Sequence, residues 1–199
     1  MAKARKSARK SVRTSRARVR KAATNDAIAL LKADHRQVEK WFKEFLSARA
    51  GRNRKKLAQR ICQALEAHTQ IEEEIFYPTF LQATGEAAIH HEAEVEHEGA
   101  KKLIAEIEHS GPEDEYYDAK VKVLSEMIKH HVNEEEKRGG MFAKARQSDM
   151  DLRELGERLA ARKAQLMEGA TGSQEDTFAQ LSSRAPARSR PNWRPTTRH

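Results

Sequence analysis

The chain has 199 residues, of which 38% are apolar and 34% charged, with nine glycines and five prolines. This length and the scarcity of turn-forming residues favour one all-α domain and argue against a turn-rich β fold. The single cysteine, Cys62, excludes an internal disulfide. No apolar run approaches the roughly 18 residues that cross a bilayer. We therefore expect a cytoplasmic protein that does not enter a membrane.

The positive charge lies at the two ends of the chain. Residues 1–25 contain ten Lys/Arg and no acid, and residues 176–199 contain five Arg and one Asp. Removing these +10 and +4 charges from the formal total of +8 leaves −6 for residues 26–175. Residues 1–23 lack both a core stripe and the apolar stretch of a secretory signal, which predicts a disordered basic arm. The arm either binds nucleic acid nonspecifically, by counterion release, or is a solubilising extension.

Between the ends, apolar residues recur at three- and four-residue steps, which predicts amphipathic helices. Four such segments follow one another. The first is capped by Thr24, Asn25 or Asp26 and ends at Gly51, and the next three end near Pro78, at Ser110-Gly111-Pro112 and at Gly139-Gly140. Their short connections predict an up-down four-helix bundle over residues 24–147. A further apolar stripe predicts an additional C-terminal helix over residues 148–169. Residues 170–199, rich in Ser, Thr, Arg and Pro, are predicted to form a disordered tail.

The second helix carries a histidine and a glutamate one turn apart. In HTQIEEEIFYP, Glu72 follows His68 by four residues, so both side chains project from one face. The apolar residues that turn this face toward the core are Leu57, Ile61, Ala64 and Leu65. We interpret Glu73 and Glu74 as part of a solvated face.

The fourth helix repeats this arrangement, but two registers compete in HHVNEEEKRGGMF. The pair is either His131 with Glu135 or His130 with Glu134. Helical phase favours His131, which continues the apolar stripe of Val121, Leu124, Met127 and Ile128. We therefore predict that His130 lies on the flank and that Glu134 and Glu136 are solvated.

The first and third helices each add one inward histidine. His35 follows Leu31 by four residues, and His97 falls between Ala93 and Ala100. Six polar groups thus converge on one core: His35, His68, Glu72, His97, His131 and Glu135. His90 and Glu94 lie near the inward face and are additional candidates.

Buried polar groups need partners, and a metal pair would satisfy all six at once. Imidazole and carboxylate suit iron, manganese or zinc. Two carboxylates can bridge metals about 3.5–4 Å apart, whereas six ligands are too many for one tetrahedral zinc. The pattern therefore predicts a two-metal site.

Residues 27–145 resemble the hemerythrin-like, or HHE cation-binding, family. The segments that carry the resemblance are LLKADHRQVEKWF, HTQIEEEIFYP, EVEHEGAKKLI and HHVNEEEKRGGMF. The resemblance implies two non-haem iron ions with bridging carboxylates, held by the six residues named above. Oxygen-carrying hemerythrins have a second histidine four residues before His97, and Ala93 stands there in this chain.

The missing histidine leaves several functions open. The leading hypothesis is a non-enzymatic protein that binds or senses oxygen, nitric oxide or peroxide. The alternatives are a di-iron enzyme that acts on peroxide or nitric oxide, and a nucleic-acid-associated protein that uses its basic arm.

Overall fold

The computed structural model describes residues 26–48 and 52–183, with side chains described for residues 26–48 and 53–168. The predicted basic arm and residues 184–199 lie outside the described part, so the nucleic-acid interaction stays a prediction. The four long helices of the first 136 residues are α2 (Ala27–Ser47), α3 (Arg52–Ile71), α5 (Ala87–His109) and α6 (Tyr117–Glu136).

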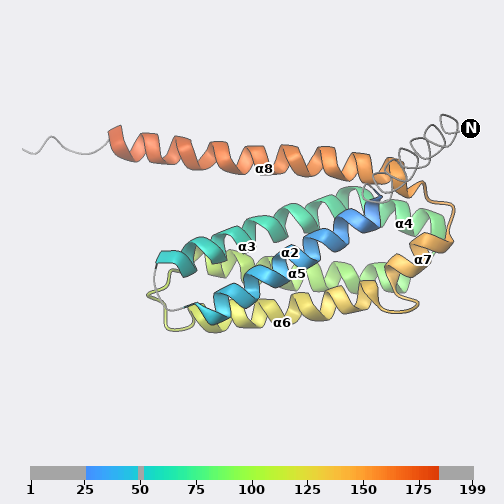
Figure 1. Cartoon of the computed structure of the whole chain (residues 1–199), viewed down its shortest axis with the longest axis horizontal. Coiled ribbons are helices and arrows are strands. Elements are labelled where there is room, and N and C mark those ends of the chain that lie inside the picture. Colours follow the sequence, from blue (N-terminus) through green and yellow to red (C-terminus); the bar gives the residue numbers. More distant parts are fainter. Residues whose placement is uncertain (1–25, 49–51, 184–199) are drawn as a thin grey trace, which may run out of the picture.

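These four helices form a closed bundle. α2 packs on α3, α3 on α5, α5 on α6, and α6 returns to α2. They run side by side along the long axis of the molecule, and the short connections alternate between its two ends (Figure 1). The predicted all-α, up-down bundle is confirmed. At its start, the Asp26 side chain accepts a hydrogen bond of 2.7 Å from the Ala29 backbone N–H and caps α2.

The buried apolar residues form two clusters on either side of a polar layer. One cluster contains Val38, Leu65, Ala100 and Ile128, and the other contains Leu31, Ile71, Ala93 and Met141, each with further members. On each of the helices α2, α3 and α5, a histidine lies between a residue of the first cluster and a residue of the second. The core thus surrounds one internal polar layer that crosses the bundle.

The second predicted helix does not end near Pro78. α3 continues into a π-helical segment, η1 (Glu72–Phe76), and then into α4 (Tyr77–Thr84), which ends at Gly85 with a φ of 69°. The Tyr77 backbone N–H donates to the Glu72 carbonyl, five residues back. Pro78 therefore lies in the first turn of α4, where proline is tolerated.

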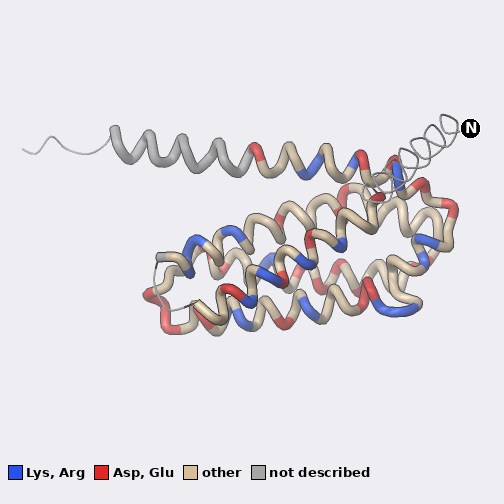
Figure 2. Tube along the Cα trace, viewed as in Figure 1, with Lys and Arg blue, Asp and Glu red and all other residues tan. Residues whose placement is uncertain are grey.

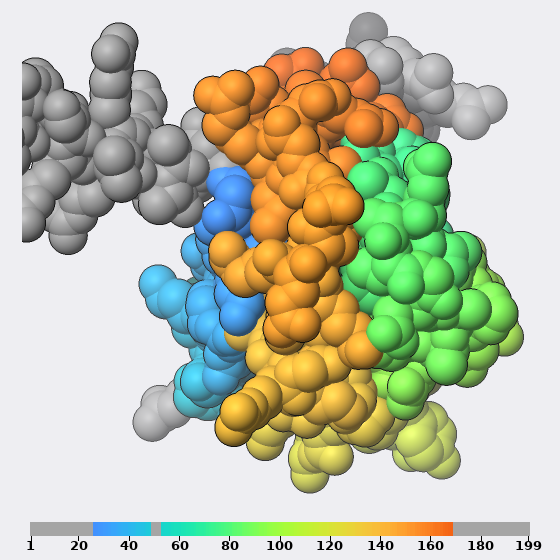
Figure 3. Space-filling view, turned by 90° about the vertical axis from the view of Figure 1, so that its right-hand side faces the viewer, coloured from blue at the N-terminus to red at the C-terminus, as the bar shows by residue number. Residues whose placement is uncertain are grey.

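A short helix that the sequence analysis missed, α7 (Met141–Gln147), follows Gly139-Gly140. Gly139 has a φ of 79°, and a Cβ on Gly140 would lie 2.3 Å from the Glu134 carbonyl oxygen. Both glycines are therefore required by the tight turn after α6. α7 and the segment that leads into the last helix cover this end of the bundle (Figure 3).

The last helix, α8 (Leu152–Ser183), is longer than predicted, because it continues beyond Gly169 into the predicted tail. It lies outside the bundle and packs on α2, α3 and η1 (Figure 1). Leu155 and Leu159 are buried in this contact. Lys/Arg and Asp/Glu residues are both distributed along the described helices (Figure 2). Among these helices, none combines the length and the apolar character of a bilayer-crossing segment.

The contact of α8 with the bundle yields a stability prediction. Leu159→Ala should lower the free energy of unfolding by about 2–5 kcal/mol, because it leaves a cavity in a fully buried position. Denaturant titration measures the change. Arg158→Ala, at the exposed neighbouring position, should stay within about 0.5 kcal/mol. Equal losses in the two variants would show that α8 is not anchored by this face.

Candidate metal centre

The polar layer brings together all six residues predicted from the sequence. Each of the four long helices supplies one buried histidine, and Glu72 and Glu135 add two buried carboxylates. The histidines are His35 on α2, His68 on α3, His97 on α5 and His131 on α6. The predicted helical phase thus places every one of these side chains inside the bundle.

The histidines form two close pairs. The Nε2 atoms of His35 and His68 are 3.1 Å apart, and those of His97 and His131 are 3.2 Å apart. Because the members of each pair come from two different helices, the four rings line the polar layer from all sides. Two groups of donor atoms result, one around each pair.

The two glutamates lie between the pairs. Glu72 Oε2 is 3.2 Å from the Nε2 atom of His68 and 3.5 Å from that of His97. Glu135 Oε2 is 3.4 Å from the Nε2 atom of His35 and 3.7 Å from that of His131. Each carboxylate therefore contacts one histidine of either pair, which is the placement of a ligand that bridges two ions.

The second nitrogen of every ring faces outward to a carboxylate. The Nδ1–H groups donate to Glu136 from His35 (2.8 Å), to Asp34 from His68 (3.4 Å), to Glu73 from His97 (3.0 Å) and to Glu96 from His131 (2.8 Å). A carboxylate only accepts hydrogen bonds, so each neutral ring carries its proton on Nδ1. The four Nε2 lone pairs consequently point inward. This carboxylate–histidine arrangement is typical of metal-ligating histidines.

Three of the four outer carboxylates are in turn paired with cations. Lys163 of α8 contacts Asp34, Lys101 contacts Glu73 at 2.8 Å, and Arg36 contacts Glu136 at 2.5 Å. The fourth carboxylate, Glu96, lies 3.2 Å from Nε2 of His130. These cations stabilise the ionised carboxylates that hold the rings in place.

Burial in the centre disfavours the charged forms of three histidines and of Glu72. Burial lowers the pKa of His35 and His97 and lowers that of His68 to about 4. Burial and the nearby Glu135 carboxylate raise the pKa of Glu72 well above its usual range. Burial opposes ionisation of His131 too, but Glu135 and Glu96 together raise its pKa.

Several buried oxygen atoms in the layer have no hydrogen-bond partner. They are both carboxylate oxygens of Glu72 and Oε2 of Glu135. Isolated buried carboxylate oxygens are costly, and adjacent imidazole lone pairs repel one another. Cations between the pairs would satisfy all of these groups. The donor set, four imidazoles and two carboxylates, thus fits a pair of metal ions.

Tyr77 is a member of the centre that the sequence analysis missed. Its hydroxyl lies 3.1 Å from His97 Nε2 and donates to Glu135 Oε1 at 3.2 Å. Tyr77 follows Glu72 by five residues, a spacing that turns away from Glu72 in an α-helix but not in the wider π-helix η1. The proline after Tyr77 was the one available signal of an irregular turn.

The interpretation of Glu73 and Glu136 as solvated residues is wrong. Both hold a histidine of the centre, because the neighbouring helix brings His97 or His35 within hydrogen-bond distance. Glu74 and Glu134 do lie on the surface side, where they pair with Arg162 and Lys137.

The flanking histidines lie outside the centre. The side chain of His130 is 64% exposed, whereas that of His131 is 5% exposed, as helical phase predicts. His90 packs against the Tyr77 ring with centroids 5.9 Å apart. Its Nδ1 atom lies 3.4 Å from Oε2 of Glu94, whose side chain is 51% exposed. Neither of these additional candidates reaches the six converging residues.

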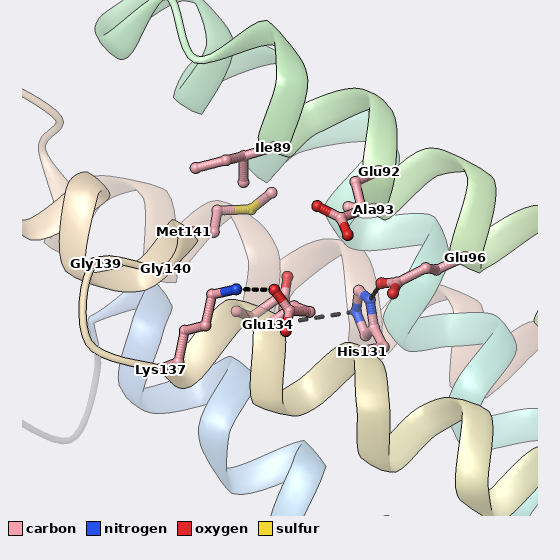
Figure 4. A pocket seen from close by; sticks show the side chains of 11 residues that line it. Ile89, Glu92, Ala93, Glu96, His131, Glu134, Lys137, Gly139, Gly140 and Met141 are labelled. Carbon is pink, nitrogen blue, oxygen red and sulfur yellow. Dashed lines mark hydrogen bonds and ion pairs between the residues drawn. The ribbon is translucent and has the colours of Figure 1, made fainter.

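A pocket of about 270 Å³ leads from the surface to one end of the centre. Its walls come from α5, α6 and the turn into α7, and His131 lines it (Figure 4). The buried Glu135 is also part of its lining. Ala93, four residues before His97 on α5, lines this pocket. The small side chain leaves this space open beside the pair of His97 and His131.

A four-helix bundle with buried groups of histidine and glutamate that could hold metal ions is a cation-binding type of bundle. The family model of the hemerythrin HHE cation binding domain matches residues 26–145. The chain therefore belongs to the hemerythrin HHE cation-binding family.

A solved structure supports the fold independently. It is a hemerythrin HHE cation binding domain-containing protein from Mycobacterium kansasii, with a TM-score of 0.64 and 21% sequence identity. The match covers 75% of this chain and 92% of that protein. No curated protein sequence matches the chain.

The unpartnered Glu72 carboxylate yields a prediction for metal-free protein. Glu72→Gln should raise the melting temperature of the chelator-treated protein at pH 7, because folding no longer buries this carboxylate or requires it to take up a proton. The raised pKa makes the folded state bind more protons than the unfolded chain above pH about 4.5. The gain should therefore shrink as the pH falls toward that value.

Thermal unfolding at several pH values measures the effect. Glu73→Gln is the matched control, since it removes a carboxylate that already has His97 and Lys101 as partners and should not stabilise the protein. A lower melting temperature for metal-free Glu72→Gln would show that the carboxylate is satisfied without metal.

Proposed function

We propose that the protein holds two non-haem iron ions and binds or senses oxygen or a related small molecule, such as nitric oxide or peroxide. The observation that carries the proposal is the set of four inward Nε2 lone pairs around unpartnered carboxylate oxygens. Glu72 and Glu135 would bridge the ions, and each histidine pair would bind one of them. Bound iron would supply a redox-active centre able to take an exogenous ligand.

Space for that ligand lies at the end of the centre that contains His97 and His131. Ala93 contributes no ligand atom, and the pocket beside it reaches His131 and Glu135. On the other side, Phe142 stacks on His35 with ring centroids 5.8 Å apart and an interplanar angle of 10°. This asymmetry favours ligand binding at the ion near His97 and His131.

A di-iron enzyme that acts on peroxide or nitric oxide is the second candidate, and the position of Tyr77 favours it. The phenol places a proton 3.2 Å from Glu135 Oε1, inside the buried layer. Burial and the nearby carboxylates raise the pKa of Tyr77 well above its usual range, so the proton stays on the phenol at neutral pH. Steady consumption of added peroxide would distinguish the enzyme from a binding protein.

Metal analysis tests the proposal directly. Protein from iron-replete cells should contain about two iron ions per chain, because the donor set divides into two groups that share the Glu72 carboxylate. Elemental analysis and an ultraviolet-visible spectrum, recorded aerobically and after addition of nitric oxide, provide the measurement. One equivalent of zinc, bound while iron was available, would contradict the di-iron proposal.

Neighbouring histidines on α6 provide the matched pair of variants. His131→Ala should remove most of the iron, because its Nε2 lies within the donor set, whereas exposed His130→Ala should retain most of it. The loss of iron should also lower the melting temperature of the protein as isolated, since metal bound only to the folded state stabilises it. Retention of iron by His131→Ala together with its loss in His130→Ala would contradict the assigned ligands.

A further inference from the structure

The pocket that leads to His131 carries more negative charge than a neutral ligand requires. Its lining includes four carboxylates and one ammonium group: Glu92, Glu96, Glu134, Glu135 and Lys137. Lys137 pairs with Glu134 and so neutralises one of the four carboxylates (Figure 4). Oxygen and nitric oxide are uncharged and gain nothing from this lining. A hydrated divalent cation is attracted by it.

A group of side chains that could hold a metal ion adjoins the outer part of this pocket. Glu92, Glu96 and His130 each offer a ligand atom, and these atoms all lie within 4.8 Å of one another. Glu92 and Glu96 also line the pocket. An ion held there would exchange part of its water shell for carboxylate and imidazole, which suit divalent iron.

A second, independent feature lies at the inner end of the pocket. Glu135 lines it and is 2% exposed, and its Oε2 has no hydrogen-bond partner. Glu96 connects the two ends, because its Oε1 lies 3.2 Å from His130 and its Oε2 lies 2.8 Å from His131. Acidic oxygen atoms thus occur at both ends of the pocket and between them.

The other opening near the centre lacks this excess of negative charge. A groove of about 600 Å³ between α2 and α6 reaches His35 and Glu136. Its lining includes four cationic side chains, Arg36, Lys43, Lys129 and Lys137, and three carboxylates, Glu39, Glu126 and Glu136. Arg36 and Lys32 both pair with Glu136 beside His35. A divalent cation therefore meets no excess of negative charge on that side, and the carboxylate nearest the centre, Glu136, is already paired with two cations.

We propose that the acidic pocket is the loading route for divalent iron and that Glu92, Glu96 and His130 hold the incoming ion at its mouth. The proposal rests on the proposed function, since it supplies iron to the same centre. It assigns to Glu92 and His130, which are both exposed, a role in the rate of metal uptake that is separate from the equilibrium metal content.

Loading kinetics of the full-length apoprotein test this route. Ferrous iron is added without oxygen, and a strong chelator then traps unincorporated ions at successive times. Glu92→Lys should slow uptake about tenfold at low salt, because it reverses the charge at the mouth. The effect should shrink at high salt, where exposed charges are screened. His130→Asn should slow uptake about threefold by removing one ligand of the outer group.

Glu94→Lys is the matched control. Glu94 lies on the same helix with a side chain 51% exposed, but it pairs with His90 and does not line the pocket. It should change the rate less than about twofold. All three variants should reach the iron content of the unmodified protein and keep its melting temperature.

The outcomes separate the two proposals. Unchanged rates in Glu92→Lys and His130→Asn, or equal slowing by Glu94→Lys, would overturn the loading route and leave the di-iron centre intact. Failure of the unmodified apoprotein to take up iron at all would overturn the proposed function, and the loading route with it.

Discussion

The constraint on which this structure depends is the burial of four imidazole rings with their lone pairs directed at one another. Each outer carboxylate fixes the Nδ1 proton, so two pairs of unprotonated Nε2 atoms lie about 3 Å apart inside an apolar core. Two carboxylates without sufficient partners complete the layer. Such an arrangement is unfavourable without cations, and it therefore makes metal binding and folding parts of one equilibrium.

The apolar core and the polar layer support each other. The core clusters above and below the layer exclude water, which strengthens every electrostatic interaction inside it. The outer shell of carboxylates and cations lies at the edge of the layer, where partial exposure makes ionised groups less costly. The buried histidines and glutamates thus lie at the centre of the layer, and the partly exposed carboxylates and cations surround them.

The sequence predicted the centre well where a straight α-helix determines which side a residue faces. His131 was distinguished from His130, and Glu135 from Glu134, by the apolar stripe alone. Tyr77 was missed because a π-helical segment shifts its direction relative to Glu72. Glu73 and Glu136 were misinterpreted because contacts between helices, which periodicity does not report, bring them to a histidine. α7 was missed because seven residues are too few to establish a helical period.

The position of α8 changes what should be regarded as the complete unit of this protein. The match to the family model ends at residue 145, yet Lys163 contacts Asp34, and Asp34 accepts the Nδ1 proton of His68. On the same helix, Arg162 contacts Glu74 at 2.6 Å, next to the Glu73 that holds His97. Part of the support for His68 therefore comes from outside the four-helix domain. A fragment that ends at residue 145 would keep all six converging histidines and glutamates but would lack Lys163, the counter-ion of Asp34. Truncation at this boundary would therefore separate the candidate ligands from a charge that helps to orient one of them.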